Sequence, residues 1–305
     1  MIELGDDTSI EQAVDRITAA LEGAELSFGQ GAESAEQEAI WLVLHACGVE
    51  TMEDLSWGQK LEPQQGEVIT SSLRKRIQGG QPMAYVLRQT WFAGFNFYVD
   101  ERVIIPRSFI SEWIPERFSP WIDAEQVETI LDMCCGSGCI GIAAALELEN
   151  ARVTLSDVSE DAVMVAQINI ERHKVGNRVT THCGDRFEGL DQRFDLILCN
   201  PPYVSSQRMA TLPEEFRAEP ELALKAGDDG LEFIAPFFAE VRDYLTDRGH
   251  AIVEAGSASA AVEKTWPEVP FTWLGTEFDE RVLLIISAAE LDQFQSHFKS
   301  AGGKH

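Results

Sequence analysis

The sequence predicts an α/β protein whose main part is a doubly wound, mostly parallel sheet of about seven strands. From about residue 120 onward, short apolar runs alternate with segments of helical periodicity. A glycine-rich turn, Gly136-Ser137-Gly138-Cys139-Ile140-Gly141, separates the first of these runs from the helix that follows it. Before this region, residues from about 8 to 84 carry helical patterns only. We therefore expect a small helical domain followed by a larger sheet domain.

The spacing of the apolar runs predicts the direction of the strands. Parallel strands are expected over residues 130–134, 152–156, 178–182, 194–199 and 250–254, with long helices over 160–173 and 230–245 and another over 257–266. Two last runs, residues 271–274 and 282–286, are separated only by residues 275–281. A parallel crossover needs about a dozen residues or more, so these two strands are predicted to be antiparallel. The sheet should therefore contain one reversed strand near its end.

Helix signals and turn signals divide the first part of the chain. Ser9 and Gln12 have the spacing of a capping box, a second helix should end at Gly48, and a third should begin at Pro63. The aromatic run 90–99 and the apolar run 103–105 predict a β-hairpin with its turn at residues 100–102. The predicted domains are a helical domain (1–84), a β-hairpin linker (85–112), a sheet domain (113–289) and a C-terminal tail with a short helix (290–305).

Charge points to the kind of partner. The chain carries 24 Lys and Arg against 51 Asp and Glu, a formal net charge of −27. Such a chain repels nucleic-acid backbones and suits a basic protein, although salt adaptation of the surface explains the same charge. We therefore expect no direct nucleic-acid partner.

Cysteine and histidine usage and the apolar runs indicate the compartment. The chain has six Cys and six His without paired CxxC units, so neither a metal site nor disulfides are expected. Runs such as residues 282–289 are too short to span a bilayer, and the acidic start lacks the basic region of a signal peptide. These features predict a cytoplasmic protein that does not enter a membrane.

A nucleotide-like cofactor is predicted at the glycine-rich turn. Glycines allow the backbone to approach a ligand, and Asp157 closes the next strand, where a carboxylate can accept both ribose hydroxyls. These features allow NAD or S-adenosylmethionine. Asp132, four residues before Gly136, and the reversed terminal strand resemble the class I methyltransferases and favour S-adenosylmethionine. The predicted cofactor-binding residues are Asp132, Cys134, Cys135, Gly136, Ser137, Gly138, Asp157, Asp185, Arg186, Phe187 and Asn200.

The loop after the third predicted strand carries part of that assignment. Gly184-Asp185-Arg186-Phe187 looks like the adenine-binding loop of the class I methyltransferases. Asp185 would accept from the adenine amine, and Phe187 or the stem of Arg186 would cover the ring. Core packing explains Phe187 equally well, so both interpretations stay open for it.

The second candidate site is Asn200-Pro201-Pro202-Tyr203, directly after a buried apolar run. Two prolines prevent the strand from continuing, so the chain turns at the carboxyl edge of the sheet, where ligands bind in open α/β sheets. The Asn200 amide and the Pro201 carbonyl offer two acceptors beside the Tyr203 ring. Such a site suits a flat group with an NH2, either a nucleobase amine or a carboxamide.

Three segments together resemble a known family. They are Asn200-Pro201-Pro202-Tyr203, Ile105-Pro106-Arg107, and residues 219–224 with 227–230. They resemble the protein glutamine N5-methyltransferases, over residues from about 8 to 289. One bacterial branch of that family methylates peptide release factors, and another methylates large-subunit ribosomal protein three. The segment led by Ser108 is similar to the ribosomal-protein branch, whereas the release-factor branch usually has Pro-acid-Thr-Glu there.

The resemblance implies a class I methyltransferase (Rossmann-like) fold, S-adenosylmethionine as cofactor, and substrate recognition by the helical domain. It implies that Asn200 and Pro201 bind the substrate glutamine amide, that Tyr203 packs against the amide plane with Pro202 shaping the turn, and that Pro106 and Arg107 serve the substrate side. This sequence departs from the release-factor branch at Cys134-Cys135, where Gly and Thr are frequent, and at Arg186, which often is aromatic.

Other functions remain open from the sequence. A release-factor methyltransferase is the nearest alternative, and an adenine or guanine methyltransferase shares the Asn-Pro-Pro-Tyr motif. The negative charge opposes a nucleic-acid substrate, because base-flipping enzymes need a positive surface for the backbone. A non-catalytic chaperone for a basic ribosomal protein suits the charge equally well, but the intact cofactor residues favour an enzyme.

Overall fold

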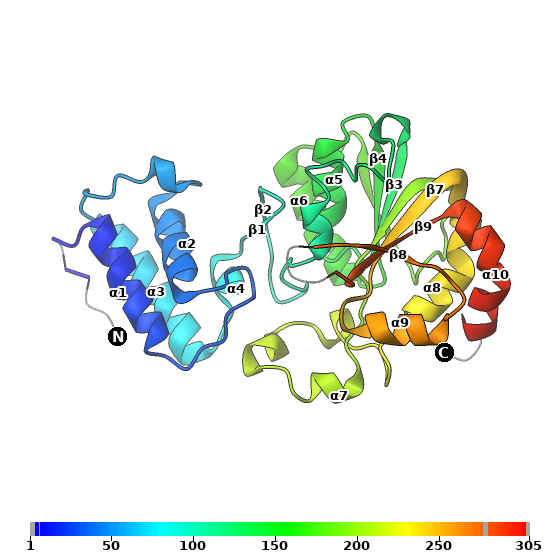
Figure 1. Ribbon diagram of the computed structural model, residues 1–305. Coiled ribbons are helices and arrows are strands. Elements are labelled where there is room, and N and C mark those ends of the chain that lie inside the picture. Colours follow the sequence, from blue (N-terminus) through cyan, green and yellow to red (C-terminus); the bar gives the residue numbers. More distant parts are fainter. Residues whose placement is uncertain (1–3, 6, 277–279, 303–305) are drawn as a thin grey trace. The chain divides into compact units, whose positions relative to one another are not determined.

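The computed structural model describes residues 4–5, 7–276 and 280–302, and the chain divides into two compact units (Figure 1). The first, here the helical unit, comprises Met1–Thr90, Val99–Glu101 and Pro213–Ala218. The second, here the sheet unit, comprises Trp91–Tyr98, Arg102–Leu212 and Glu219–His305. Pro213–Ala218 therefore belongs to the helical unit although both of its neighbours in sequence belong to the sheet unit.

The helical unit follows the predicted helix signals closely. Its elements are α1 (Ile10–Glu22), α2 (Ala35–Cys47), α3 (Pro63–Gly79), α4 (Met83–Leu87) and a 3₁₀ helix at Met52–Asp54. The capping box is confirmed, because the Ser9 hydroxyl accepts from the Gln12 N–H and the Gln12 side chain accepts from the Ser9 N–H. Gly48 ends α2 with φ 68°, a left-handed conformation that favours glycine.

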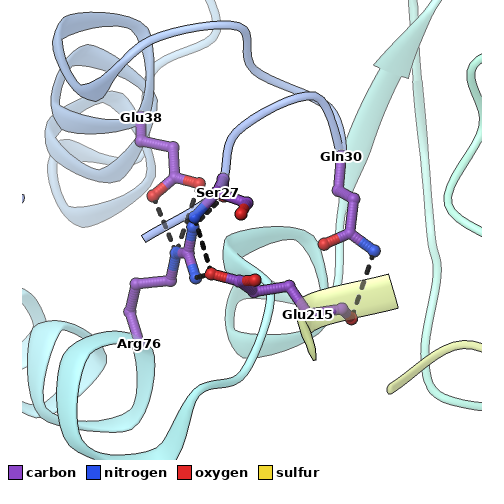
Figure 2. Close-up of polar contacts among 5 residues, drawn as sticks. All are labelled: Ser27, Gln30, Glu38, Arg76 and Glu215. Carbon is purple, nitrogen blue, oxygen red and sulfur yellow. Dashed lines mark hydrogen bonds and ion pairs between the residues drawn. The ribbon is translucent and has the colours of Figure 1, made fainter. Parts of the chain in front are cut away.

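A buried charge cluster lies in the helical unit (Figure 2). The Arg76 Nε donates to both carboxylate oxygens of Glu38 at 3.3 and 3.0 Å, and its Nη2 donates to the Ser27 carbonyl at 2.8 Å. Its Nη1 lies 3.9 Å from Glu215 Oε1, which also accepts from the Ser27 N–H at 2.6 Å. The Gln30 side chain donates to the Glu215 carbonyl at 3.4 Å. Glu215 lies in the 3₁₀ helix Glu214–Ala218, so these contacts hold that segment in the helical unit.

The sheet unit has the predicted topology. Its strands are β3 (Thr129–Met133), β4 (Arg152–Asp157), β5 (Val179–Cys183), β6 (Phe194–Cys199), β7 (Leu245–Glu254), β8 (Thr272–Leu274) and β9 (Leu283–Ser287), in the order β5-β4-β3-β6-β7-β9-β8. The strands from β5 to β7 pair in parallel, whereas β9 is antiparallel to both of its neighbours. The prediction of a doubly wound seven-stranded sheet with a reversed last strand is confirmed.

Helices cover both faces of this sheet (Figure 1). The helices α5 (Cys139–Glu147) and α6 (Glu160–His173) lie on one face, and α8 (Ile234–Glu240) and α10 (Ala288–Gly302) lie on the other. Ile130 contributes to the core on the first face and its neighbour Leu131 to the core on the second, as the alternation of side chains along a strand requires. The remaining elements are α7 (Ser206–Met209), α9 (Ser259–Thr265) and 3₁₀ helices at Phe109–Glu112, Ala124–Gln126, Glu221–Ala223, Val241–Tyr244 and Gly256–Ala258.

The predicted hairpin is wrong in its details. A two-stranded sheet pairs β1 (Thr90–Phe92) with β2 (Phe95–Phe97), so the turn lies at Ala93 and Gly94 and not at residues 100–102. Both turn residues have positive φ, 49° and 82°, as the two-residue turns that suit the twist of a hairpin require. Residues 103–105 form no strand. Gly94 was therefore the turn signal of this segment.

The C-terminal helix α10 spans Ala288–Gly302, where a tail with a short helix was expected. Its Phe298 is fully buried against Phe238 at a ring-centroid distance of 5.1 Å. The last three residues of the predicted tail lie outside the described residues. The helix expected over 230–245 is shorter than predicted: α8 covers only Ile234–Glu240, and β7 already begins at Leu245. None of the helices in the described part of the chain combines the length and apolarity needed to cross a bilayer.

Candidate active site

The predicted site residues gather at the carboxyl edge of the sheet. The chain passes outward from β3 through β4 to β5, and then continues on the other side of β3 with β6 and β7. A ligand crevice forms where the strand order reverses in this way, between β3 and β6. The glycine-rich turn follows β3, Asp157 ends β4, Asn200 follows β6 and Glu254 ends β7. The topology thus brings both predicted motifs to one edge.

The glycine-rich turn has the backbone that its residues predict. Cys134, Gly136 and Gly138 all have positive φ, between 53° and 77°, and Gly138 caps the start of α5. A Cβ atom at Gly138 would lie 2.8 Å from Leu155 Cδ1, and together with φ 77° this crowding favours glycine at the position. The N–H of Gly136 donates to Asp157 Oδ2 at 2.9 Å and fixes the turn to the end of β4.

Asp157 retains acceptor capacity toward a ligand. Its Oδ2 accepts from the Gly136 N–H and its Oδ1 accepts from the Ser159 N–H, each at 2.9 Å. Burial raises the pKa of Asp157, and these backbone hydrogen bonds counteract the rise. Each carboxylate oxygen can accept a second hydrogen bond, as two ribose hydroxyls require.

Asp132 lies beneath the turn in the core of the sheet. It is fully buried, and its Oδ2 accepts from the Gly141 N–H at 2.8 Å in the first turn of α5. Burial raises the pKa of Asp132 to about 7, against the effect of the Gly141 hydrogen bond. Its Oδ1 has no hydrogen-bond partner among the described residues. A buried acceptor of this kind beside the turn suits a donor group on a ligand.

The other predicted residues of the turn are Ser137, Cys134 and Cys135, and their binding to a cofactor stays a prediction. Ser137 is buried, and its carbonyl accepts from the Asn169 side chain at 2.9 Å. Hydrogen bonding to Cys199 and burial raise the pKa of the Cys134 thiol, and burial raises that of Cys135. Both thiols are therefore protonated, and a thiolate nucleophile is not available in this turn.

The loop after β5 places its predicted residues in different surroundings. Phe187 is buried, and its ring stacks on Tyr244 at 4.3 Å and on Phe237 at 5.7 Å between centroids. Phe187 thus packs in the core, and a contact with the cofactor stays a prediction. Arg186 has φ 49° and its guanidinium contacts Glu240 and Asp185, each at 3.3 Å, while Asp185 is exposed beside it. The structure leaves Asp185 and the Arg186 stem as the side chains of this loop that can face a ligand.

The Asn-Pro-Pro-Tyr motif leaves its amide available. The half-buried Asn200 side chain forms no hydrogen bond with any residue that the structure describes. Pro201 is buried, and Pro202 and Tyr203 are half-buried. After the motif the backbone is fixed again, because the N–H of Val204 donates to the Leu224 carbonyl at 2.9 Å. The Asn200 amide thus lies at the carboxyl edge with its hydrogen-bonding capacity unused among the described residues.

Tyr203 is held from two sides. Its hydroxyl donates to Glu254 Oε1 at 2.9 Å, and a Cβ atom at Gly256 would lie 2.5 Å from its ring. Burial, followed by the charge and hydrogen bond of Glu254, raises the pKa of Tyr203, so the phenol remains protonated. Glu254 was not among the predicted site residues, although a single acid that ends an apolar strand two residues before a glycine was a usable signal.

The segment 105–108 is fixed by Glu219 and by the same Glu254, both in the sheet unit. Arg107 makes a bidentate pair with Glu219, in which Nη2 donates to Oε2 at 2.7 Å, and the Ile105 N–H donates to Glu219 Oε1 at 3.2 Å. The Ser108 hydroxyl donates to Glu254 Oε2 at 2.6 Å. Pro106 is buried between these anchors. Pro106 and Arg107, predicted for the substrate side, thus lie in a segment tied to the loop at Glu219 and to the end of β7.

The chain is similar to known methyltransferases. Residues 118–249 match the family model described as "Methyltransferase small domain". The chain is 43% identical over 275 residues to a ribosomal protein uL3 glutamine methyltransferase of Francisella tularensis, which covers 89% of this chain and 88% of that protein. It is 39% identical over 279 residues to the protein of the same name from Burkholderia pseudomallei, which covers 88% of this chain and 91% of that protein. Because the two alignments cover 89% and 88% of this chain, the similarity includes residues of both the helical unit and the sheet unit.

Proposed function

The chain belongs to the family of ribosomal protein uL3 glutamine methyltransferases, and from this membership we propose that it methylates the side-chain amide nitrogen of a glutamine in ribosomal protein uL3. S-Adenosylmethionine is the methyl donor in this proposal, and the helical unit recognises the substrate. The reaction is assigned to the cytoplasm, where ribosomal proteins are made. Of the two groups that suit the site at Asn200, a nucleobase amine and a carboxamide, we propose the carboxamide.

The residues of the carboxyl edge fit this donor. The turn at Gly136 and Gly138 brings backbone close to a ligand, the Asp157 carboxylate has acceptor capacity for a ribose, and Asp132 Oδ1 offers a buried acceptor without a partner among the described residues. Asp185 would accept from the adenine amine at the exposed loop after β5. When bound, S-adenosylmethionine supplies an electrophilic methyl group on a sulfonium centre.

The protein's part in the reaction is orientation and electrostatics. An amide nitrogen is a weak nucleophile, because its lone pair is delocalised into the carbonyl. Asn200 Oδ1 and the Pro201 carbonyl accept the two N–H bonds of the glutamine amide, which aims the nitrogen and favours the positive charge that develops on it. Tyr203 packs against the amide plane. The methylated nitrogen is acidic and loses its proton to solvent, so these residues need no general base before attack.

The observation that supports this mechanism most is the Asn200 side chain, which has no hydrogen bond among the described residues at the point where the strand order reverses. A turn-stabilising asparagine would use its amide on nearby backbone. The net charge of −27 supports a basic protein as the substrate and opposes a nucleic acid.

The test offers the donor with a labelled methyl group to separate pools of uL3, peptide release factors and ribosomal RNA. We expect label in uL3 alone, and tandem mass spectrometry should place it on one glutamine side chain. Label in the release factors would instead indicate that the chain acts as a release-factor glutamine methyltransferase. Label in RNA would contradict an amide substrate. A purified protein that binds the donor but labels no pool would favour a silent chaperone.

A further inference from the structure

Glu254 is a buried carboxylate that joins two segments at the candidate site, and no role follows for it from the motifs. It is the last residue of β7 and is 1% exposed. The residue before it, Val253, pairs with Cys199, which directly precedes Asn200. Glu254 thus stands on a central strand beside the start of the Asn-Pro-Pro-Tyr motif. A side chain on such a strand is held more rigidly than one on a loop.

The hydrogen bonds of Glu254 divide between its two oxygens. Oε1 accepts from the Tyr203 hydroxyl at 2.9 Å. Oε2 accepts from the Ser108 hydroxyl at 2.6 Å and from the Phe109 N–H at 3.0 Å. The first oxygen therefore binds the catalytic motif, and the second binds the Ser-led segment that follows Arg107. One carboxylate ties both segments to the edge of the sheet.

The contact with Gly256 completes the restraint on Tyr203. A Cβ atom at this glycine would lie 2.5 Å from the ring atoms Cε2 and Cζ, so backbone packs directly against the ring. Glu254 restrains the hydroxyl end of the same ring. The ring is left little freedom to rotate or tilt. A plate that must cover a planar amide within a few tenths of an ångström needs such a restraint.

We propose that Glu254 is a positioning residue for amide methylation, which holds the Tyr203 ring beside Asn200 and couples it to Ser108. This proposal rests on the proposed function, because it assigns Tyr203 the task of packing against the substrate amide. Glu254 acts through Tyr203 and does not touch the reacting atoms.

The substitution Glu254→Gln tests the restraint on Tyr203, because glutamine has nearly the same shape as glutamate. A glutamine side chain has one acceptor oxygen where the carboxylate has two. The Phe109 N–H cannot reverse its direction, so the new amide oxygen has to face Phe109 and its NH2 has to face the Tyr203 hydroxyl. The Tyr203 hydroxyl then loses its charged acceptor and can only accept a weaker, neutral hydrogen bond from that NH2. Tyr203→Phe removes the hydrogen bond altogether.

The control is Asp195→Asn at the opposite end of the sheet. Asp195 lies near the start of β6, and its carboxylate accepts from the Thr129 N–H at 3.0 Å and from the Thr246 hydroxyl at 2.9 Å. It is also a carboxylate that ties neighbouring segments, but it lies away from the carboxyl edge. Both substitutions should lower the melting temperature, and only Glu254→Gln should change turnover.

The measurement is single-turnover methylation of uL3, together with calorimetry of S-adenosylhomocysteine binding. We expect Glu254→Gln and Tyr203→Phe each to lower kcat by about 10- to 100-fold, with cofactor affinity within about twofold of the wild type. The double variant should lose no more than the worse single variant, because both substitutions act on the same interaction between Tyr203 and residue 254. Wild-type turnover for Glu254→Gln, effects that multiply in the double variant, or a loss confined to cofactor binding would each overturn the proposal.

A second readout separates this proposal from the proposed function. In protein labelled with [13C]tyrosine at the ring carbon that bears the hydroxyl, the resonance of Tyr203 should shift and broaden in Glu254→Gln but not in Asp195→Asn. This result does not depend on the substrate. If the wild type labels no uL3 while the resonance responds, the function is wrong and the restraint stands; an unchanged resonance overturns the restraint.

Discussion

Arg76 offers the sharpest test of how the helical unit is held together. It is 1% exposed and lies between two carboxylates, with Glu38 bound to its Nε and Glu215 Oε1 at 3.9 Å from its Nη1 (Figure 2). It also donates to the Ser27 carbonyl, and its guanidinium lies 5.8 Å from the centre of the Phe28 ring. Arg76→Ala removes all of these contacts and leaves the carboxylates in place.

The expected loss follows from burial. Removal of one partner of a buried ion pair costs about 3–5 kcal/mol, because the other charge is left uncompensated in the interior. Glu38 is the side chain most affected, since it is 3% exposed. The predicted loss is therefore about 3–5 kcal/mol of unfolding free energy at neutral pH, with local opening of Pro213–Ala218, which Glu215 anchors.

The loss should also depend on pH with a definite sign. Burial raises the pKa of Glu38 above its ordinary value of 4.5 although Arg76 counteracts the rise, so protons bind more tightly in the folded state. Stability therefore falls as pH rises from 4.5 through the raised folded value. Arg76→Ala removes the opposing charge and extends this range upward. The difference between variant and wild type should be largest at neutral pH and should shrink as Glu38 becomes protonated.

The assay is urea unfolding of the full chain, with hydrogen exchange of α2 and α3 to locate the change. Lys75→Ala is the control, because Lys75 is the exposed neighbour of Arg76 in the same helix. It should change stability by less than about 0.5 kcal/mol. The double variant Arg76→Met, Glu38→Leu should recover much of the loss, because apolar residues of similar size often replace a buried pair without cost. An Arg76→Ala protein as stable as the control, or a loss that grows at acid pH, would refute this reasoning.

Three further predictions concern the site and the partner. Asp157→Ala should weaken S-adenosylmethionine binding by about 1.5–3 kcal/mol in a folded protein, and calorimetry with unchanged affinity would remove Asp157 from the ribose site. The rate of association with uL3 should fall as ionic strength rises, because salt screens the attraction between the −27 chain and a basic protein. Stopped-flow association rates that do not change with salt would indicate that the negative charge serves solubility and not partner binding. Asn200→Ala should keep the fold and lower kcat by about 10²–10³, and Asn200→Asp should lower it less. Thermal unfolding measured beside single-turnover rates distinguishes this catalytic role from a role in the turn alone, which would lower stability as well.

Local signals in the sequence were sufficient for much of the fold. The capping box at Ser9, the left-handed Gly48 and the glycines at 136 and 138 each act within a few residues, so the sequence specifies them directly. The short separation of β8 and β9 excluded a parallel crossover and predicted the reversed strand. The hairpin was misplaced because the run 90–99 was predicted to be one strand, whereas its own turn lies at Ala93 and Gly94.

Long-range contacts could not be predicted in the same way. Glu215 lies 188 residues from Ser27, which binds it, and no local pattern indicates that Pro213–Ala218 belongs with the helices. Glu254 meets Ser108 across 146 positions. Motifs predicted which residues reach the carboxyl edge, whereas the carboxylates that hold them there depend on the packed sheet.

The central claim is methyl transfer to a glutamine side chain of uL3 at Asn200, and one experiment addresses it directly. Wild-type protein and Asn200→Ala are each mixed in excess with uL3 and S-adenosylmethionine, and the methylated peptide is followed over time by mass spectrometry. The account predicts one methyl group on a glutamine side-chain nitrogen, formed about 10²–10³ times more slowly by the folded variant. A methyl group on any other residue, or equal rates for the two proteins, would contradict it.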